Sequence, residues 1–259
     1  MSTSGQHGQK HARPPAQRRG RVDAQPAYIL HARPYRETSL LLEVFSRDYG
    51  RVALLARGAR RPHSTLRGLL LAFQPLELSW SGKGEVLTLM KAEWQGGQPL
   101  LAGLPLFCGY YLNELLLRLL PREDAHPRLF GHYLQILLRL GYSPRHQVAE
   151  ADLRSFERAM LAELGYGLTL DHDAHGQPVL AEARYIYEIE RGPLPVSPEE
   201  DSALFLICGQ TLLDMQRDDY THPVTRGEAK QLMRRLLAHY LDGVELEARK
   251  WVRKLQELC

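Results

Sequence analysis

The sequence predicts an α+β protein in which a small β-barrel comes first and a helical domain follows. Apolar and polar residues alternate along five short segments between residues 28 and 94, as in strands with one buried face. After residue 103 the apolar period becomes helical. Residues 1–70 contain 13 Lys and Arg against 4 Asp and Glu, whereas residues 71–259 contain 20 against 26. A basic β part therefore precedes a mildly acidic helical part.

The strands are predicted over residues 28–33, 38–46, 51–57, 76–80 and 86–94. In the second strand the two faces consist of Leu40, Leu42 and Val44 and of Leu41, Glu43 and Phe45. Ser64 is expected to cap a short helix through Ala72. Five strands with a helix between the third and the fourth, in ~70 residues, are typical of the OB-fold, a partly open barrel that binds oligonucleotides. A β-meander or an SH3-like barrel fits the same pattern.

Helices are predicted in the second part of the chain, over residues 104–120, 127–140, 150–164 and 245–258. Another is expected to follow the start signal Ser197-Pro198-Glu199-Glu200 and to carry residues 204–215. The capping box Thr225-Arg226-Gly227-Glu228 opens one more, which Gly243 closes. Between these helices, residues 165–194 lack a helical period, and residues 185–189 alternate like a short strand.

Three regions follow from these patterns. Residues 1–25 contain no Leu, Ile or aromatic residue and only one acid, so they are expected to form a disordered basic tail. Residues 26–96 form the predicted OB-fold domain, which we expect to bind DNA. Residues 97–259 form the predicted helical domain, with a small irregular insertion near residues 165–194.

The composition places limits on compartment and chemistry. No uncharged apolar run approaches the ~18 residues that a membrane span needs, and the N-terminus has no apolar core typical of a signal peptide. The cysteines, Cys108, Cys208 and Cys259, lie far apart, which excludes a disulfide framework and a cysteine zinc cage. We expect a cytoplasmic, nucleoid-associated protein.

Motifs of the common catalytic classes are missing. The sequence has no Walker A loop, nucleophile elbow, HExxH helix, EF-hand or kinase signature. One polar cluster, Asp171, His172, Asp173 and His175, supplies half of a closed metal site. It leaves open an alternative function, that of a metal-dependent nucleic-acid enzyme such as a nuclease. The simpler interpretation is a solvated turn before Gly176.

The densest basic group in a folded region is the segment from Arg57 to Arg61, with Arg67 six residues further on. The planar guanidinium of arginine donates two parallel hydrogen bonds to phosphate. Tyrosines near these arginines suit a single strand, because bases stack on aromatic rings. The predicted DNA-binding residues are Arg33, Tyr35, Arg36, Tyr49, Arg51, Arg57, Arg60, Arg61, Arg67 and Lys83. The alternative is a polar barrel rim with buried tyrosines.

Several segments of the chain, in the same order, resemble the RecO family of bacterial DNA repair and recombination mediators. They are Ala27 to Leu40, Gly50-Arg51-Val52, Ala56 to Arg61, Leu66-Arg67-Gly68, Phe73 to Leu76, Tyr110 to Leu115, Leu164-Gly165-Tyr166-Gly167, Ala229-Lys230 and Leu246 to Lys250. The resemblance spans residues 27–253. It implies an OB-fold barrel, a helical C-terminal domain, binding of single- and double-stranded DNA, and ATP-free annealing of complementary strands.

The same resemblance implies partners and no turnover chemistry. The expected role is to help RecR load the RecA recombinase, and the acidic C-terminal tail of the single-stranded-DNA-binding protein is expected to dock on the helical domain. Candidate partner-binding residues there are Tyr110, Tyr111, Leu115, Arg118, Arg122 and Arg139. A third hypothesis is a pure protein–protein adaptor whose arginines meet an acidic protein. No membrane partner is expected.

The family often carries a four-cysteine zinc module after the Leu-Gly-Tyr-Gly turn. This chain has no cysteine between Gly165 and Leu194, and two separated cysteine pairs are what such a zinc site requires. We therefore predict no stoichiometric zinc. Elemental analysis of protein purified without added metal checks this, and one zinc atom per chain would contradict it.

Overall fold

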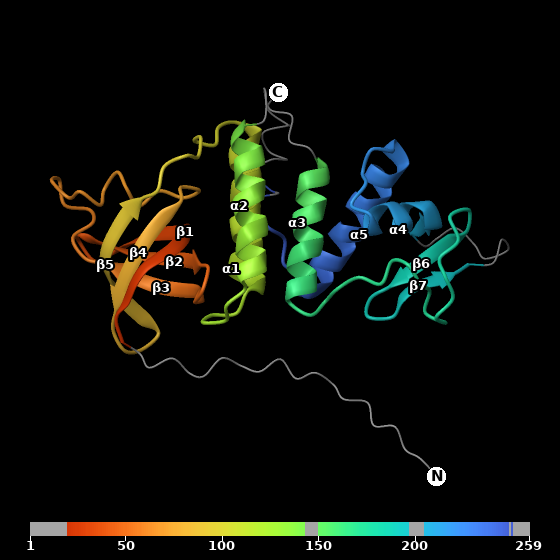
Figure 1. Ribbon diagram of the computed structural model, residues 1–259, viewed down its shortest axis with the longest axis horizontal. Coiled ribbons are helices and arrows are strands. Elements are labelled where there is room, and N and C mark those ends of the chain that lie inside the picture. Colours follow the sequence, from red (N-terminus) through yellow and green to blue (C-terminus); the bar gives the residue numbers. More distant parts are fainter. Residues whose placement is uncertain (1–19, 143–149, 197–204, 249, 251–259) are drawn as a thin grey trace, which may run out of the picture.

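The computed structural model describes residues 20–142, 150–196, 205–248 and 250. The barrel lies at one end of an elongated molecule, three helices follow it, and two further helices with a second small sheet lie at the other end (Figure 1). The predicted α+β class, an OB-type barrel followed by a helical domain, is confirmed. No helix of the described residues is long and apolar enough to cross a membrane.

The barrel is closed and contains five strands. They are β1 (Val22–Tyr35), β2 (Ser39–Ser46), β3 (Gly50–Ala56), β4 (Leu76–Ser81) and β5 (Val86–Trp94). The order around the barrel is β1-β2-β3-β5-β4, with β4 returning to β1. Only β3 and β5 are parallel among these neighbours. The interior is filled by Ile29, Leu42, Val44, Leu54, Leu76, Leu78 and Trp80, as alternation along each strand predicts.

Two predictions about the barrel are wrong in detail. Strand β1 begins at Val22, inside the segment assigned to the basic tail, because Val22 pairs with Trp80 and extends the β1–β4 ladder. Residues 1–19 lie outside the described residues. The helix predicted over residues 64–72 is absent: residues 65–69 form turns, Leu66 and Leu69 pack on the barrel interior, and Leu70 is buried in it. Packing of these leucines overrides the helical start signal at Ser64.

The helical domain contains α1 (Leu104–Leu119), α2 (Pro127–Tyr142), α3 (Glu150–Glu163), α4 (Gly209–Gln216) and α5 (Pro223–Tyr240). The second sheet has the order β7-β6-β8, with β6 (Arg184–Glu188), β7 (Gly192–Pro195) and β8 (Leu206–Cys208). The strand predicted over residues 185–189 is therefore confirmed. The predicted helix 245–258 lies mostly outside the described residues.

The helix expected from Ser197 is wrong over Leu206–Cys208, and its start signal, residues 197–200, lies outside the described residues. Leu206–Cys208 pair with β6, which satisfies their backbone groups in a sheet, and helix begins only at Gly209. Ile207 also favours a strand at this position, because it is fully buried and its side chain is β-branched.

The predicted capping box of the last described long helix is also wrong. Helix α5 starts at Pro223, which has no N–H to leave unpaired, and the His222 side chain accepts from the Val224 N–H. The Thr225 hydroxyl donates to Asp214 at 2.7 Å. Glu228 accepts from the Thr211 hydroxyl at 2.6 Å and from the Cys208 N–H at 2.9 Å. These polar residues therefore join α5 to α4 and β8 instead of capping α5.

Aromatic packing joins the barrel to the helices. Tyr28 of β1 and Phe45 of β2 face Phe130 and Tyr133 of α2, with ring centroids 5.2–6.1 Å apart. Leu30 occupies a register shift between β1 and β2. The Asn113 amide of α1 donates to the Leu30 carbonyl at 2.8 Å, and Asn113 accepts from the Tyr133 hydroxyl. We call these five residues, Tyr28, Phe45, Asn113, Phe130 and Tyr133, the aromatic seam.

We predict that Phe130→Ala destabilises the whole protein. The ring is 7% exposed and touches both barrel aromatics, so its removal leaves a cavity and should lower the free energy of unfolding by about 3–5 kcal/mol. Urea denaturation followed by circular dichroism measures this. Leu100→Ala is the control, because Leu100 is 72% exposed and should change the free energy by less than about 0.5 kcal/mol. Equal losses in the free energy of unfolding for the two variants would contradict the role of the aromatic seam in stability.

Candidate nucleic-acid interface

The predicted DNA-binding arginines gather where β1 turns into β2 and where β3 ends. Tyr35 pairs with Ser39, and Leu40 pairs with Ala56. Because of this register, the turn carrying Arg36 and the loop beginning at Arg57 emerge at the same end of the barrel. Both segments come from distant parts of the sequence, and the sheet brings them together.

Hydrogen bonds fix the turn and the loop to each other. The Arg60 N–H donates to the Thr38 carbonyl at 2.8 Å. The Arg60 guanidinium reaches back to the carbonyls of Arg36 at 3.4 Å and of Glu37 at 3.3 Å. Arg60 therefore has a structural role besides its charge. The sequence predicts only DNA binding for this arginine, since backbone partners across two loops leave no sequence pattern.

An exposed tyrosine lies beside these arginines. Tyr35 is 39% exposed, and the Arg36 guanidinium lies 5.4 Å from the centre of its ring. Arg33, two residues before Tyr35 on β1, is also exposed. This end of the barrel thus combines cationic groups with one accessible aromatic ring, the combination that suits a single nucleic-acid strand.

The loop after β3 carries the remaining arginines on successive turns. The N–H of Arg61 donates to the Gly58 carbonyl, that of Ser64 to Arg61, and that of Arg67 to Ser64. The side chains of Arg57, Arg61 and Arg67 are exposed and form no ion pair with another described residue. Glu37 is the one acid in residues 31–42 and 57–75. We call Arg33, Tyr35, Arg36, Arg57, Arg60, Arg61 and Arg67 the arginine face.

Three predicted DNA-binding residues lie elsewhere. The Arg51 side chain is 17% exposed and lies 3.5 Å from Glu43, which also pairs with Arg122. Burial lowers the pKa of Arg51, and this guanidinium is committed to the contact between barrel and helices. Glu43 lies on the same face of β2 as Phe45. This alternation in the sequence could have indicated that Glu43 faces the helical domain.

The Tyr49 ring packs edge-on against Trp80, with centroids 5.4 Å apart, beside the barrel interior. Unlike the exposed Tyr35, Tyr49 therefore lies against the barrel interior. Lys83 is exposed in the β4–β5 hairpin. It precedes Val86, whose parallel partner is Ala53, so Lys83 lies toward the Gly50 end of β3, away from Arg57.

The predicted partner-binding residues do not form one groove. Tyr111 and Leu115 are buried in the helical core, which makes their assignment to a surface groove wrong. The Tyr111 hydroxyl donates to the buried Glu157 at 2.6 Å. Tyr110 is half exposed and packs edge-on against Phe73. The three arginines form ion pairs: Arg118 with Glu114, Arg122 with Glu43, and Arg139 with Asp152.

The polar cluster after α3 forms a closed turn. One Asp173 carboxylate oxygen accepts from the N–H groups of His175 at 2.8 Å and Gln177 at 2.9 Å. His172 lies 3.2 Å from Asp171 and lowers the pKa of that carboxyl through a hydrogen bond. Across the described residues, no three His, Cys, Asp or Glu side chains are grouped to hold a metal ion. The cluster gives no support to a metal-dependent nuclease.

Comparison with known families agrees with the two-part architecture. Residues 23–97 match the model of the N-terminal part of recombination protein O, and residues 103–250 match that of its C-terminal part. The first match covers the barrel that carries the arginine face. The second covers the described helices and the small sheet.

Curated relatives match along almost their whole length. A DNA repair protein RecO from Dechloromonas aromatica is 62% identical over 240 residues, 93% of this chain and 99% of the relative. Proteins of the same name from Aromatoleum aromaticum and an Azoarcus species are 54% and 52% identical, each over 92% of this chain and 98% of the relative. The chain therefore belongs to the RecO family of DNA repair proteins.

Proposed function

We propose that this DNA repair protein binds single- and double-stranded DNA through the arginine face and anneals complementary strands without ATP. The proposal rests on the fixed pairing by Arg60 of two arginine-bearing segments, residues 31–42 and 57–75, which together contain one acid, Glu37. Backbone segments held together in this way keep the arginines close to one another, which lowers the entropic cost of binding successive phosphates. Membership of a DNA repair family supports the same assignment.

Phosphate contacts explain annealing without a chemical step. Arginines that neutralise the backbones of two strands reduce their mutual repulsion. Contacts to phosphate carry no sequence information and leave the base edges free to pair. Tyr35 offers one face on which an unpaired base stacks. Binding of this kind needs neither a nucleotide nor a metal, and we propose that the protein acts as a mediator and not as a turnover enzyme.

We further propose that the protein helps RecR to load the RecA recombinase and that it contacts the single-stranded-DNA-binding protein. The acidic tail of that protein is assigned to the helical domain. A hollow of about 400 Å³ between α2 and α3 is lined by Arg139, Arg158 and His132, with Ala159 and Ala162 as apolar contacts, and by Asp218, which pairs with Arg158 at 2.9 Å. Cationic groups around a partly apolar hollow suit an acidic peptide that ends in apolar residues.

The decisive test of the main proposal is an ATP-free annealing assay with two complementary fluorescent strands. Pairing without cleavage supports the mediator. Cleavage of labelled DNA in magnesium or manganese would instead identify a nuclease. If the protein binds neither strand at low salt, the result would favour the hypothesis of a pure protein–protein adaptor.

We predict that the combined substitution of Arg57, Arg61 and Arg67 by Ala weakens DNA binding for all sequences alike. Arg60 is kept because its guanidinium holds two loops together. If all three groups touch phosphate, the log–log salt slope on single strands shrinks by up to ~2.1, at ~0.7 for each phosphate. Fluorescence anisotropy over a salt series measures the slope.

The matched control replaces Arg128, Arg217 and Arg234, three exposed arginines of the helical domain. It changes the net charge by the same amount and should leave the slope nearly unchanged. Equal losses in both variants would show that only net charge matters. An unchanged slope in the folded triple variant would remove this loop from the DNA site.

For the acidic tail, we predict that Arg139→Ala combined with Arg158→Ala weakens binding of a fluorescent peptide with the C-terminal sequence of the single-stranded-DNA-binding protein. Loss of two charge-assisted contacts should lower the affinity at least about tenfold. Arg128→Ala, on the same helix α2 but outside the hollow, is the control. Full peptide affinity in the double variant would exclude this hollow.

A further inference from the structure

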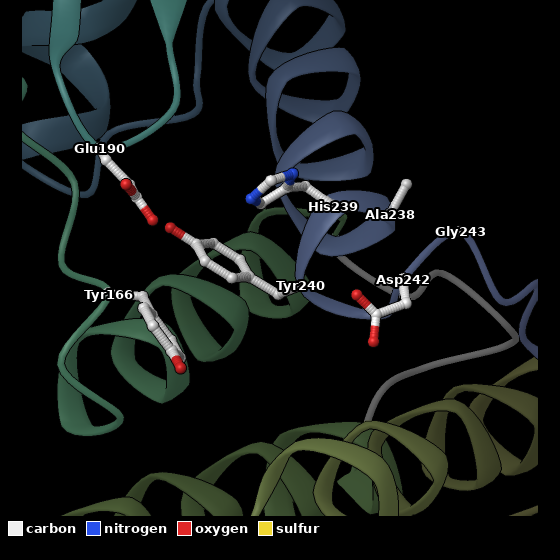
Figure 2. A pocket seen from close by; sticks show the side chains of 7 residues that line it. All are labelled: Tyr166, Glu190, Ala238, His239, Tyr240, Asp242 and Gly243. Carbon is white, nitrogen blue, oxygen red and sulfur yellow. The ribbon is translucent and has the colours of Figure 1, made fainter.

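A second polar hollow lies beyond α3, where the end of α5 approaches the β6–β7 turn. It measures about 470 Å³ and is lined by Tyr166, Glu190, Ala238, His239, Tyr240, Asp242 and Gly243. A neighbouring hollow of about 320 Å³ shares Tyr166, Glu190 and Tyr240 with it. The walls come from the end of α3, the β6–β7 turn and the end of α5, and Figure 2 shows these side chains together.

Two tyrosine rings form the floor of this hollow. Tyr166 and Tyr240 are stacked, with centroids 4.3 Å apart and planes inclined by 26°. Tyr166 is 45% exposed, so one ring face remains available to a ligand. It stands in the Leu164-Gly165-Tyr166-Gly167 segment, where Gly165 has a φ of +87°. The glycine turns the chain sharply after α3 and directs it past α5.

Two carboxylates and the His239 imidazole surround the rings. In Figure 2 the Glu190 carboxylate is directed toward the Tyr240 hydroxyl, and Asp242 follows the end of α5. Burial and the Glu190 charge raise the pKa of Tyr240. Neither carboxylate forms an ion pair with a described residue. The carboxyl end of α5 adds the negative end of an 18-residue helix dipole.

Lysine and arginine are missing from the described lining of both hollows. No Lys or Arg is among their lining residues, although the chain has 33 such residues. Arg191, the neighbour of Glu190, pairs with Glu188 at 2.7 Å. The two carboxylates therefore disfavour phosphate in this hollow, and His239 is the one titratable base among its described lining residues.

We propose that this hollow is a docking site for an arginine side chain presented by a partner protein. A guanidinium is planar and stacks on an exposed aromatic face, which fits Tyr166. At the same time it donates to a carboxylate beside the rings, which fits Glu190, a lining residue of both hollows. A lysine ammonium fits less well, because it is more strongly hydrated and does not stack as a plane. This site is independent of the DNA-binding proposal and has the opposite charge.

The test uses the full-length protein and a fluorescein-labelled Gly-Arg-Gly-Arg-Gly peptide, with the Lys-for-Arg peptide beside it. The arginine peptide should bind more tightly, and its binding should weaken with salt. Glu190→Gln should lower the affinity about tenfold and Tyr166→Ala about fivefold. Tyr166→Phe keeps the ring and should bind like the unaltered protein.

Glu85→Gln is the matched control, since it removes an exposed carboxylate in the β4–β5 hairpin and changes the net charge equally. It should leave peptide binding unchanged. Oligothymidine binding should be the same for Glu190→Gln and Tyr166→Ala as for the unaltered protein. Equal affinity of both peptides, or equal losses in Glu190→Gln and Glu85→Gln, would overturn the proposal, as would loss of oligothymidine binding in Tyr166→Ala.

Discussion

The barrel and the helices depend on the aromatic seam between them. Tyr28 and Phe45 lie on the outer surface of β1 and β2, and in an isolated barrel water would surround them. Against α2 they form four ring contacts with Phe130 and Tyr133, each worth about 0.5–1.5 kcal/mol beyond the area buried. The barrel therefore shares one hydrophobic core with the helices and keeps a separate one inside.

Polar contacts fix the position of the barrel relative to the helices at the aromatic seam. The bulge at Leu30 leaves a carbonyl without a partner on β2, and a buried carbonyl without a hydrogen bond is costly. Asn113 supplies that bond from α1. Glu43 pairs with Arg51 from the barrel and Arg122 from the segment after α1. These contacts occupy one side of the barrel and leave the end with the arginine face free for a ligand.

The charge of the molecule is separated along its length. The arginine face lies on the barrel, and the hollow at Tyr166 lies beyond α3, near α5 and the small sheet (Figure 1). A rigid seam keeps such sites at a fixed separation, which a flexible linker would not do. One chain can thus present a cationic surface and an anionic hollow without either neutralising the other, since exposed charges further apart than about 10 Å are largely screened.

The sequence by itself determined the five strands of the barrel, strand β6, the helices α1, α2, α3 and α5, and the location of the basic loop, because these depend on local periodicity, turn residues and composition. Only the tertiary structure decided which charged side chains are available to a ligand. Arg51 and Arg57 look alike in sequence, yet Arg51 contacts Glu43 and Arg57 is exposed. Thr225 and Glu228 have the sequence pattern of a helix cap, but they form hydrogen bonds with residues of α4 and β8. Gly50 has a φ of +64°. A Cβ there would also lie 1.8 Å from the Asp124 carbonyl oxygen. Such contacts join residues distant in the chain, and local pattern does not encode them.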